Sequence, residues 1–336
     1  MYCIKQLPED FIVEEIASFT MSEQGHFEVY SVTKRNLTTL QIVQSISRML
    51  KTPVKYIGFC GSKDKKAVTT QFISIKGPIS SQSKQKILQH NETHYSHKRD
   101  SWFTLEFRGY RRDPLSLGDH SSNKFTITVR NLNDQESNAL LKLKNKKEWN
   151  FINYFGEQRF GSKNEVIGVS LLKKDYKTAI KTILESQSDT EALVKHLKNH
   201  PNDFTGAIKL LPQKLITILV HSYQSHIWNQ LAEKFSNDSI PIVGWDTTFE
   251  DKQIEKATLD LLAKDKLTLR DFIFRDLKLS LTGGLRQRTT SANQVTLEFT
   301  DDTINQGMKA IIFKFTLEKG CYATEFIHQT LKTINT

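Results

Sequence analysis

Apolar residues recur along the first half of the chain with both helical and strand-like spacing. Residues 39–50 carry Leu40, Val43, Ile46 and Leu50 on one helical face, which predicts a helix packed against a core. Four short segments have the composition or the alternating pattern of strands: 54–59, 71–76, 103–107 and 125–129. Residues 134–149 predict a further helix with a Lys-rich outer face.

From about residue 153 the pattern becomes mainly helical. Helices are predicted at 175–185, 190–199 and 213–235, with Pro212 in position to start the last of them. Strands are predicted to return only at 295–299 and 310–317, and a terminal helix is predicted after Tyr322. Strand-rich ends that enclose a helical middle predict an α+β fold that carries an insertion.

The composition is that of a globular protein with a sizeable core. The chain has 336 residues, of which 38% are apolar and 20 are Phe, so two domains or one interrupted domain can fold. No run approaches the roughly 18 apolar residues that span a bilayer, and the N-terminus lacks a signal-peptide pattern. We therefore expect a soluble, cytoplasmic protein that does not bind membranes.

The chain is basic. Its 47 Lys and Arg residues outnumber 37 Asp and Glu residues, which gives a formal net charge of +10. Such a field attracts polyanions and makes a nucleic-acid partner more plausible, although a Lys-rich surface can also serve solubility alone. Basic clusters occur at 98–99, 108–112, 142–147, and at Arg286 with Arg288.

The pattern of potential ligands predicts neither a metal nor a nucleotide cofactor. The three cysteines are scattered and form no Cys-x-x-Cys pair. His90, His94 and His97 lie close in sequence, but no acid or thiol stands beside them at metal-ligand spacing. The glycine-containing segment 58–63 is followed by Asp64, where a phosphate-binding P-loop needs a hydroxyl residue.

One acid stands inside a lysine cluster just after a predicted strand. Asp64 lies between Lys63 and the pair Lys65 and Lys66, and nearby positive charge favours an ionised carboxylate. A charged carboxylate at a glycine-flanked strand exit is well placed to act as a nucleophile or a base. The alternative is a solvated basic turn in which the acid is incidental.

The segment Gly61-Ser-Lys-Asp-Lys-Lys-Ala-Val-Thr-Thr-Gln71 resembles the active-site signature of the TruD-type tRNA pseudouridine synthases. Asn153-Tyr-Phe-Gly-Glu-Gln-Arg-Phe-Gly161 matches a second family motif without a mismatch. Further segments resemble family motifs in the family's order: residues 5–15, 117–130, 222–229 and 317–324. Ser122 departs from the family's Gly and Glu318 from its Pro, and the first change can restrict a loop beside the substrate.

The resemblance implies a pseudouridine-synthase fold of the α+β class. The expected catalytic domain is discontinuous, comprises residues 1–152 and 290–336, and is built on a mixed, largely antiparallel sheet. A mostly helical TRUD domain is expected as an insertion at 153–289.

The resemblance also implies the chemistry and its residues. The family isomerises uridine to pseudouridine, in bacterial members uridine 13 of the tRNA D-arm, with the Asp of the motif as nucleophile. Asp64 and its basic partner Lys5 are then the catalytic residues, and the redox-neutral reaction needs no cofactor. The expected substrate-binding residues are Phe125 (stacking on the base), Asn123 (orienting it), Phe11, Tyr322, Arg159 and Lys63.

Several alternatives remain open at this stage. Phe125 is in phase with Ile127 and Val129, so it can equally be a core residue of its strand. The aromatic residues of 153–161 can pack instead of touching RNA. We expect a monomer that binds tRNA. The rival function is a non-catalytic RNA-binding or RNA-chaperone protein, but an acid in a cationic cleft repels phosphate and argues against it. An RNA hydrolase would need paired acids or a metal cluster.

Overall fold

The computed structural model describes residues 2–96, 100–161, 163–186 and 190–334. The chain forms two compact units. The first comprises Met1–Trp149, Ser291–Ala323 and Ile327–Thr336, and the second comprises Asn150–Thr290 with Thr324–Phe326. The predicted α+β class is confirmed by a mixed sheet combined with helices. The assignment of a catalytic domain and an inserted TRUD domain to these parts stays a prediction.

A nine-stranded sheet organises the first unit, and its main path runs β14-β15-β7-β2-β5-β3-β6. Strand β1 pairs with β7, and β4 pairs with β5. Among the described strands of this sheet, β2 and β5 form the one parallel pair. The strands are β1 (Cys3–Ile4), β2 (Phe11–Ala17), β3 (Phe27–Arg35), β4 (Ile57–Phe59), β5 (Val68–Lys76), β6 (Trp102–Arg111), β7 (His120–Leu132), β14 (Asn293–Asp301) and β15 (Lys309–Glu318).

Alternating apolar positions predicted most of these strands correctly. The segments 71–76, 103–107, 125–129, 295–299 and 310–317 lie within β5, β6, β7, β14 and β15. The prediction for 54–59 was right only for its second half. In the first half, the amide of Tyr56 donates to the Pro53 carbonyl at 2.9 Å and closes a 3₁₀ turn, Val54–Tyr56, before β4 begins.

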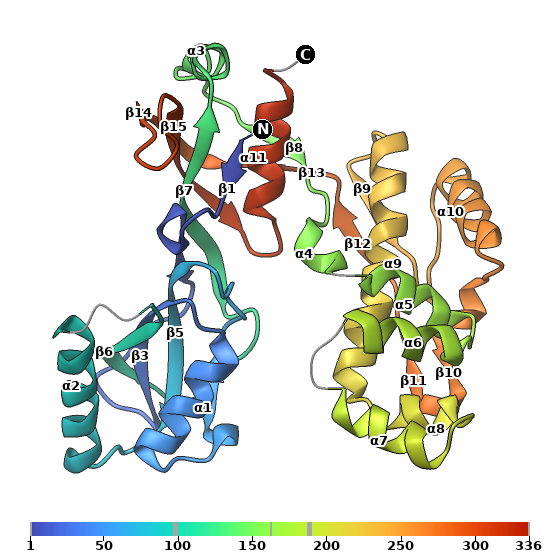
Figure 1. The fold of residues 1–336 in the computed structure, drawn as a ribbon, viewed down its shortest axis with the longest axis horizontal. Coiled ribbons are helices and arrows are strands. Elements are labelled where there is room, and N and C mark those ends of the chain that lie inside the picture. The colour runs from blue at the N-terminus through green and yellow to red at the C-terminus, as the bar shows by residue number, and fades with distance from the viewer. Residues whose placement is uncertain (1, 97–99, 162, 187–189, 335–336) are drawn as a thin grey trace. The chain divides into compact units, whose positions relative to one another are not determined.

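The helices of the first unit are α1 (Thr39–Leu50), α2 (Ser81–Ser96), α3 (Asp134–Leu141) and α11 (Ala323–Lys332). Helix α1 has the predicted bounds and begins at a capping box formed by Thr38 and Gln41. Its buried face contains Ile42, Val43, Ile46 and Leu50, which pack on β3, β5 and β6. Leu40 was assigned to this face wrongly: it is 58% exposed, because Ile42 occupies the core side instead. Figure 1 shows α1 and α2 beside this part of the sheet.

The helix predicted at 134–149 is wrong beyond Leu141. Residues 142–145 form turns, such as the one closed by the bond from the Lys144 amide to the Leu141 carbonyl at 3.1 Å, and 146–149 form no regular element. Four of the six residues 142–147 are lysines, which leaves no apolar stripe for a helix to bury. Trp149 is buried instead as the chain leaves this segment.

The second unit is mainly helical, as predicted. Its helices are α4 (Glu157–Phe160), α5 (Asn164–Leu172), α6 (Tyr176–Ser186), α7 (Glu191–Asn199), α8 (Phe204–Lys209), α9 (Gln213–Lys234) and α10 (Lys252–Lys264). Helix α9 buries Tyr223 and Trp228 almost completely.

The expectation that strands return only after residue 295 was wrong. Three two-stranded sheets come earlier, formed by β8 (Asn150–Ile152) with β13 (Thr289–Ser291), β9 (Ser239–Ile242) with β12 (Gly284–Gln287), and β10 (Ile273–Phe274) with β11 (Leu279–Ser280). Strands of two to four residues are too short to show an alternating pattern in sequence.

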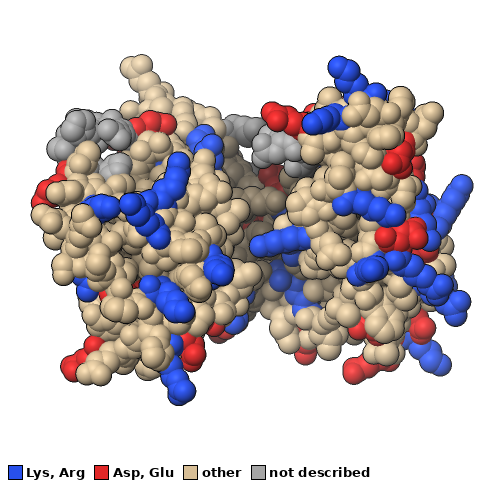
Figure 2. Space-filling model, turned by 90° about the horizontal axis from the view of Figure 1, so that it is seen from below, with Lys and Arg blue, Asp and Glu red and all other residues tan. Residues whose placement is uncertain are grey.

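Charge is distributed widely over the surface. Figure 2 shows Lys and Arg side chains spread across the face that it presents, with Asp and Glu side chains between them. In the part of the chain that the structure describes, no helix is long and apolar enough to cross a membrane.

Candidate active site

The structure brings Asp64 and Lys5 into direct contact. Asp64 lies in the loop between β4 and β5, and Lys5 lies between β1 and β2. The Lys5 ammonium donates to Asp64 Oδ2 at 2.6 Å, and the two side chains are 18% and 26% exposed. The same ammonium lies 3.8 Å from the centre of the Phe11 ring. The carboxylate is thus oriented by a cation and still accessible to a ligand.

The backbone at Lys5 is strained. Its φ of 63° lies in the left-handed region, which costs a residue with a Cβ roughly 1–2 kcal/mol. Such a conformation persists only where the surrounding structure enforces it, and it is commonest at functional sites.

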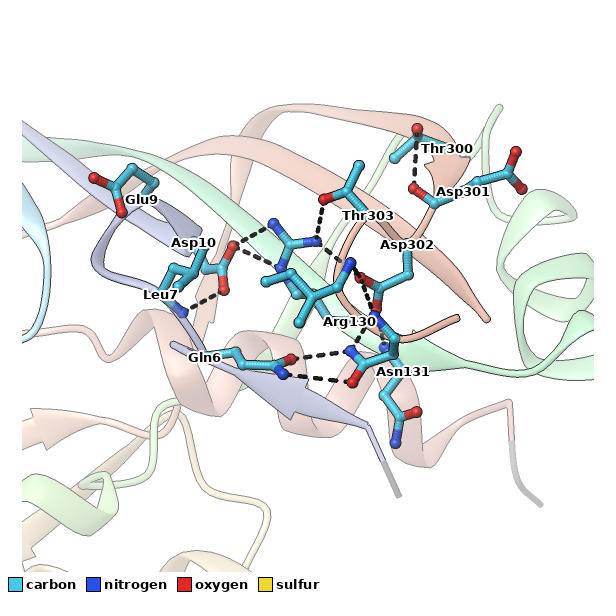
Figure 3. Close-up of polar contacts among 12 residues, drawn as sticks. Gln6, Leu7, Glu9, Asp10, Arg130, Asn131, Thr300, Asp301, Asp302 and Thr303 are labelled. Atoms are coloured by element: carbon cyan, nitrogen blue, oxygen red, sulfur yellow. Dashed lines mark hydrogen bonds and ion pairs between the residues drawn. The ribbon is translucent and has the colours of Figure 1, made fainter. Parts of the chain in front are cut away.

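A buried polar network holds the segment that follows Lys5 (Figure 3). Asp10 is 1% exposed, accepts from the Leu7 amide at 2.8 Å, and pairs with Arg130 of β7 at 2.8 Å. Arg130 also pairs with Asp302 at 3.0 Å. The side-chain amides of Gln6 and Asn305 bond each other at 3.0 and 3.4 Å. Lys5 is therefore anchored through its neighbours to β7 and to the β14–β15 connection.

The floor of the Asp64 loop is made by polar groups from β5 and α1. The Thr39 hydroxyl donates to Gln71 Oε1 at 2.9 Å and accepts from the Lys63 amide at 3.0 Å. Gln71 Nε2 in turn donates to the Gly61 carbonyl at 3.4 Å. Both side chains are buried, so the last residue of the motif holds the loop in place from below.

Lys63 is held in a buried ion pair. Its ammonium contacts Glu15 Oε1 at 2.5 Å, with the two side chains 8% and 0% exposed. The second Glu15 oxygen accepts from the Phe72 amide at 2.8 Å. Lys63 thus ties the loop to β2, and its predicted contact with substrate stays a prediction. Sequence reasoning missed Glu15, whose signal was an acid in phase with the core-facing Phe11 and Val13.

Two of the three predicted aromatic residues, Phe11 and Phe125, form a cluster next to Lys5. Phe125 is 7% exposed, stacks on Phe315 at 5.3 Å between ring centres, and meets Phe11 edge-on at 6.1 Å. The Lys5 ammonium lies over the Phe11 ring, and Phe11 in turn contacts Phe125. Phe125 is thus linked through Phe11 to the Lys5–Asp64 pair. The cluster is part of the sheet's core, so Phe125 packs as the alternative of a core residue predicts. Its stacking on a base stays a prediction. Phe315 was not anticipated.

Asn123 has an unsatisfied polar atom. It lies on β7 opposite Glu15 of β2 and Leu317 of β15, on the face that carries Phe125. Within the described residues its Oδ1 is buried and has no hydrogen-bond partner. A buried acceptor without a donor costs about 1–3 kcal/mol, which a bound ligand can recover.

The family departures lie opposite each other in the sheet. Ser122 pairs with Glu318 in the register of β7 and β15. Ser122 lies in ordinary strand conformation with no positive φ, so a side chain is accommodated there. Tyr322 lies half-buried at the N-cap of α11.

Arg159 belongs to the second unit, in α4. Its guanidinium lies 5.4 Å from the centre of the Phe155 ring, and its Nε is buried without a partner among the described residues. Phe155 packs edge-on against Trp228 at 5.5 Å. Its backbone N–H donates to Asn229 Oδ1 and its carbonyl accepts from Asn229 Nδ2, each at 2.9 Å. This motif therefore packs α4 onto α9, and a phosphate contact by Arg159 stays a prediction.

No group of three or more His, Cys, Asp or Glu side chains in metal-binding arrangement occurs among the residues described. A ring nitrogen of His90 lies 3.0 Å from the Phe103 carbonyl. His97 falls outside the described residues.

Known proteins of one family are similar to this chain over nearly its whole length. The family described as tRNA pseudouridine synthase D (TruD) matches residues 2–192, 186–238 and 230–330. The "Probable tRNA pseudouridine synthase D" of Archaeoglobus fulgidus is 29% identical, over 98% of this chain and 94% of its own length. The tRNA pseudouridine synthase D of Aquifex aeolicus is 28% identical, over 96% of each chain.

A solved structure shows the same fold. The Methanosarcina mazei crystal structure that carries the name tRNA pseudouridine synthase D (TruD) has a TM-score of 0.70 and 24% identity. It covers 98% of this chain and 93% of its own. Because the family match spans nearly the whole sequence, the chain belongs to the tRNA pseudouridine synthase D (TruD) family.

Proposed function

We propose that this protein isomerises a uridine of tRNA to pseudouridine, with uridine 13 of the D-arm as its target and Asp64 as nucleophile or base. The observation that carries the proposal is the Lys5–Asp64 pair, which presents an oriented and accessible carboxylate within a basic protein. Membership of the family supports the reaction and the class of substrate.

The reaction breaks the bond between C1′ and N1, rotates the base and rejoins it through C5. Nothing is oxidised or reduced, so a carboxylate with a fixed orientation is the main requirement. Lys5 occupies Oδ2 of Asp64, whereas Oδ1 accepts no hydrogen bond from the residues described. The free oxygen is therefore available to attack the substrate or to remove a proton from it.

The pocket for the flipped base would be formed by Asn123 and Phe125. A target uridine must leave its stack, and enzymes of this type hold the extruded base by stacking and by reading its polar edge. Uracil presents an N–H group between two carbonyls, and the Asn123 amide can supply the matching acceptor and donor. The unsatisfied Oδ1 of Asn123 would then receive the N–H of the base.

Replacing Phe125 with leucine tests the stacking role. Alanine would leave a cavity against Phe11 and Phe315, whereas leucine keeps most of the volume and removes the aromatic face. We expect the single-turnover rate to fall roughly ten- to hundredfold, because stacking contributes about 1–3 kcal/mol per base. The matched control is Phe313→Leu, a fully buried Phe opposite Ile127 in the same sheet, which should keep the rate. Equal rates in wild type and Phe125→Leu would leave Phe125 as core only.

Phosphate binding is expected to depend on exposed lysines. Lys144, Lys146 and Lys147 are exposed in the segment that follows α3. Changing all three to glutamine should weaken tRNA binding and reduce the slope of log affinity against log salt by about one per lost phosphate contact. The single-turnover rate at saturating protein should not change. The control pair Lys309 and Lys314, whose ammonium groups already contact Asp301 and Glu298, should affect the slope less when changed to glutamine.

The function itself is tested by incubating the protein with unmodified tRNA transcripts and mapping pseudouridine by chemical labelling and mass spectrometry. Pseudouridine at position 13 supports both the activity and the target. Pseudouridine elsewhere supports the activity and corrects the target. Binding without any product, across a panel of tRNAs, would favour a non-catalytic RNA-binding protein.

A further inference from the structure

Lys34 places a buried ammonium directly beneath the Asp64 loop. It lies on β3 in phase with Tyr30 and Val32, which pack against α1, and its side chain shares their face of the sheet. Lys34 has no exposed surface and is among the largest fully buried side chains described. Its Nζ donates to the Asp64 carbonyl at 2.5 Å.

This ammonium is an unusual group to bury. No ion pair joins Lys34 to a carboxylate anywhere in the described parts of the chain, and its hydrogen bond goes to the main chain of Asp64. Its register partners are Thr69 of β5 and Phe103 of β6, neither of them charged. Thr69 has a buried hydroxyl without a hydrogen-bond partner among the described residues, so this pocket is not optimised for stability.

A methionine of similar length would fill the same space without a desolvated charge, and replacing buried charges by apolar residues is often stabilising. Because packing at this position does not require a lysine, the group that the lysine contacts best explains its presence. Its contact is the backbone of the residue that we propose as the nucleophile.

We propose that Lys34 is a positioning residue for the isomerisation, whose ammonium fixes the main chain at Asp64 and so the orientation of the carboxylate. This inference rests on the proposed function. Lys5 orients the carboxylate from the exposed side of the loop, whereas Lys34 holds its backbone from the buried side.

The arrangement makes positioning sensitive to pH. Burial lowers the pKa of Lys34 from 10.5 to about 8, although the charge of Asp64 opposes this change and that of Lys63 adds to it. Its register partners on β5 and β6, Thr69 and Phe103, do not titrate. Above a pH of about 8 the ammonium loses a proton, and a neutral amine is a weaker donor to the Asp64 carbonyl. The rate of the chemical step should therefore decrease over this range.

The test compares wild type, Lys34→Met and the control Lys76→Met in single-turnover assays between pH 6.5 and 9.5. Lys76 is exposed at the end of the neighbouring strand β5. We expect Lys34→Met to bind tRNA as wild type does but to react at least tenfold more slowly at pH 7, which is about 1.4 kcal/mol in barrier. Wild type and Lys76→Met should lose rate above a pH of about 8, and Lys34→Met should lack this alkaline decrease.

Thermal unfolding supplies a readout that does not depend on activity. Between pH 8 and 10.5 the unfolded chain binds the Lys34 proton and the folded chain does not, so Lys34 makes wild type more stable as pH rises. The melting temperature of Lys34→Met should equal or exceed that of wild type at pH 7, and the difference should shrink as pH rises.

Several outcomes would overturn the inference. A Lys34→Met rate within threefold of wild type, or an alkaline decrease that persists in this variant, would show that another group titrates. If the variant does not fold, the wild-type profile still decides, because a rate that stays constant to pH 9.5 contradicts the proposal. An inactive wild type would instead refute the proposed function.

Discussion

Single-turnover formation of pseudouridine should fall by about a thousandfold or more when Asp64 is replaced with asparagine, which corresponds to about 4 kcal/mol in barrier. Asparagine has the same shape, and its amide oxygen can still accept from Lys5, so the loop should keep its conformation. It cannot act as a nucleophile or a base. The change should therefore remove chemistry and leave structure.

Two further measurements make this result specific. Affinity for tRNA should stay near that of wild type, and the free energy of unfolding should change by less than about 1 kcal/mol, since partly exposed ion pairs contribute little. The control Asp301→Asn removes a carboxylate that is 85% exposed and pairs with Lys309, and it should keep full activity. A rate for Asp64→Asn within tenfold of wild type would mean that the nucleophile lies elsewhere.

The second large effect concerns stability and should follow from Arg130→Met. Arg130 joins Asp10 and Asp302, whose side chains are 1% and 0% exposed, and removing it leaves both carboxylates buried without their cation (Figure 3). Breaking a buried pair in this way costs about 3–5 kcal/mol. Chemical denaturation should show a loss of this size.

The reason that Asp302 cannot simply take up a proton lies in its hydrogen bonds. Burial raises the pKa of this carboxyl, but donors from Asn305, Ile304 and Asn131 outweigh burial and hold its pKa below the ordinary range. Asp302 therefore favours the folded state above its ordinary pKa, and this contribution is lost as pH falls through the lowered value. Near neutral pH the charge of Asp302 therefore persists in the Arg130→Met variant, where the compensating charge of Arg130 has been removed.

Two comparisons separate this effect from the loss of stability that any Arg-to-Met substitution could cause. Arg108→Met breaks an exposed pair with Glu106, so it should cost less than about 1 kcal/mol. Adding Asp10→Asn to Arg130→Met should recover part of the lost stability, because it removes one of the uncompensated charges. Arg130→Met should also slow the chemical step, since Asp10 no longer fixes the segment that presents Lys5. Loss of stability no larger than in Arg108→Met would contradict this account of the network.

Local pattern was sufficient for several elements that have one apolar face over a long stretch, although it did not identify β2 or β3. Helix α1 was predicted with its bounds, and the alternating segments lie in β6, β7, β14 and β15. Local pattern failed in the lysine-rich turns after Leu141 and in the short strands of the second unit. In the first case no apolar face exists to hold a helix, and in the second the strands are shorter than the repeat that would reveal them.

The sequence by itself determined the mixed fold class, the family motifs and the identity of Asp64 as the candidate carboxylate. The family resemblance implied Lys5 as its basic partner, and only the tertiary structure decided how Lys5 reaches it and which other groups hold the loop. Lys5 is 59 residues away and Glu15 lies on a strand whose neighbours, β5 and β7, come from distant segments of the chain. The sequence analysis predicted no strand around Lys34, and the burial of this residue follows from the position of β3 between β5 and β6. Strand order joins residues that are far apart in the chain, and no local pattern of polar and apolar residues encodes that order.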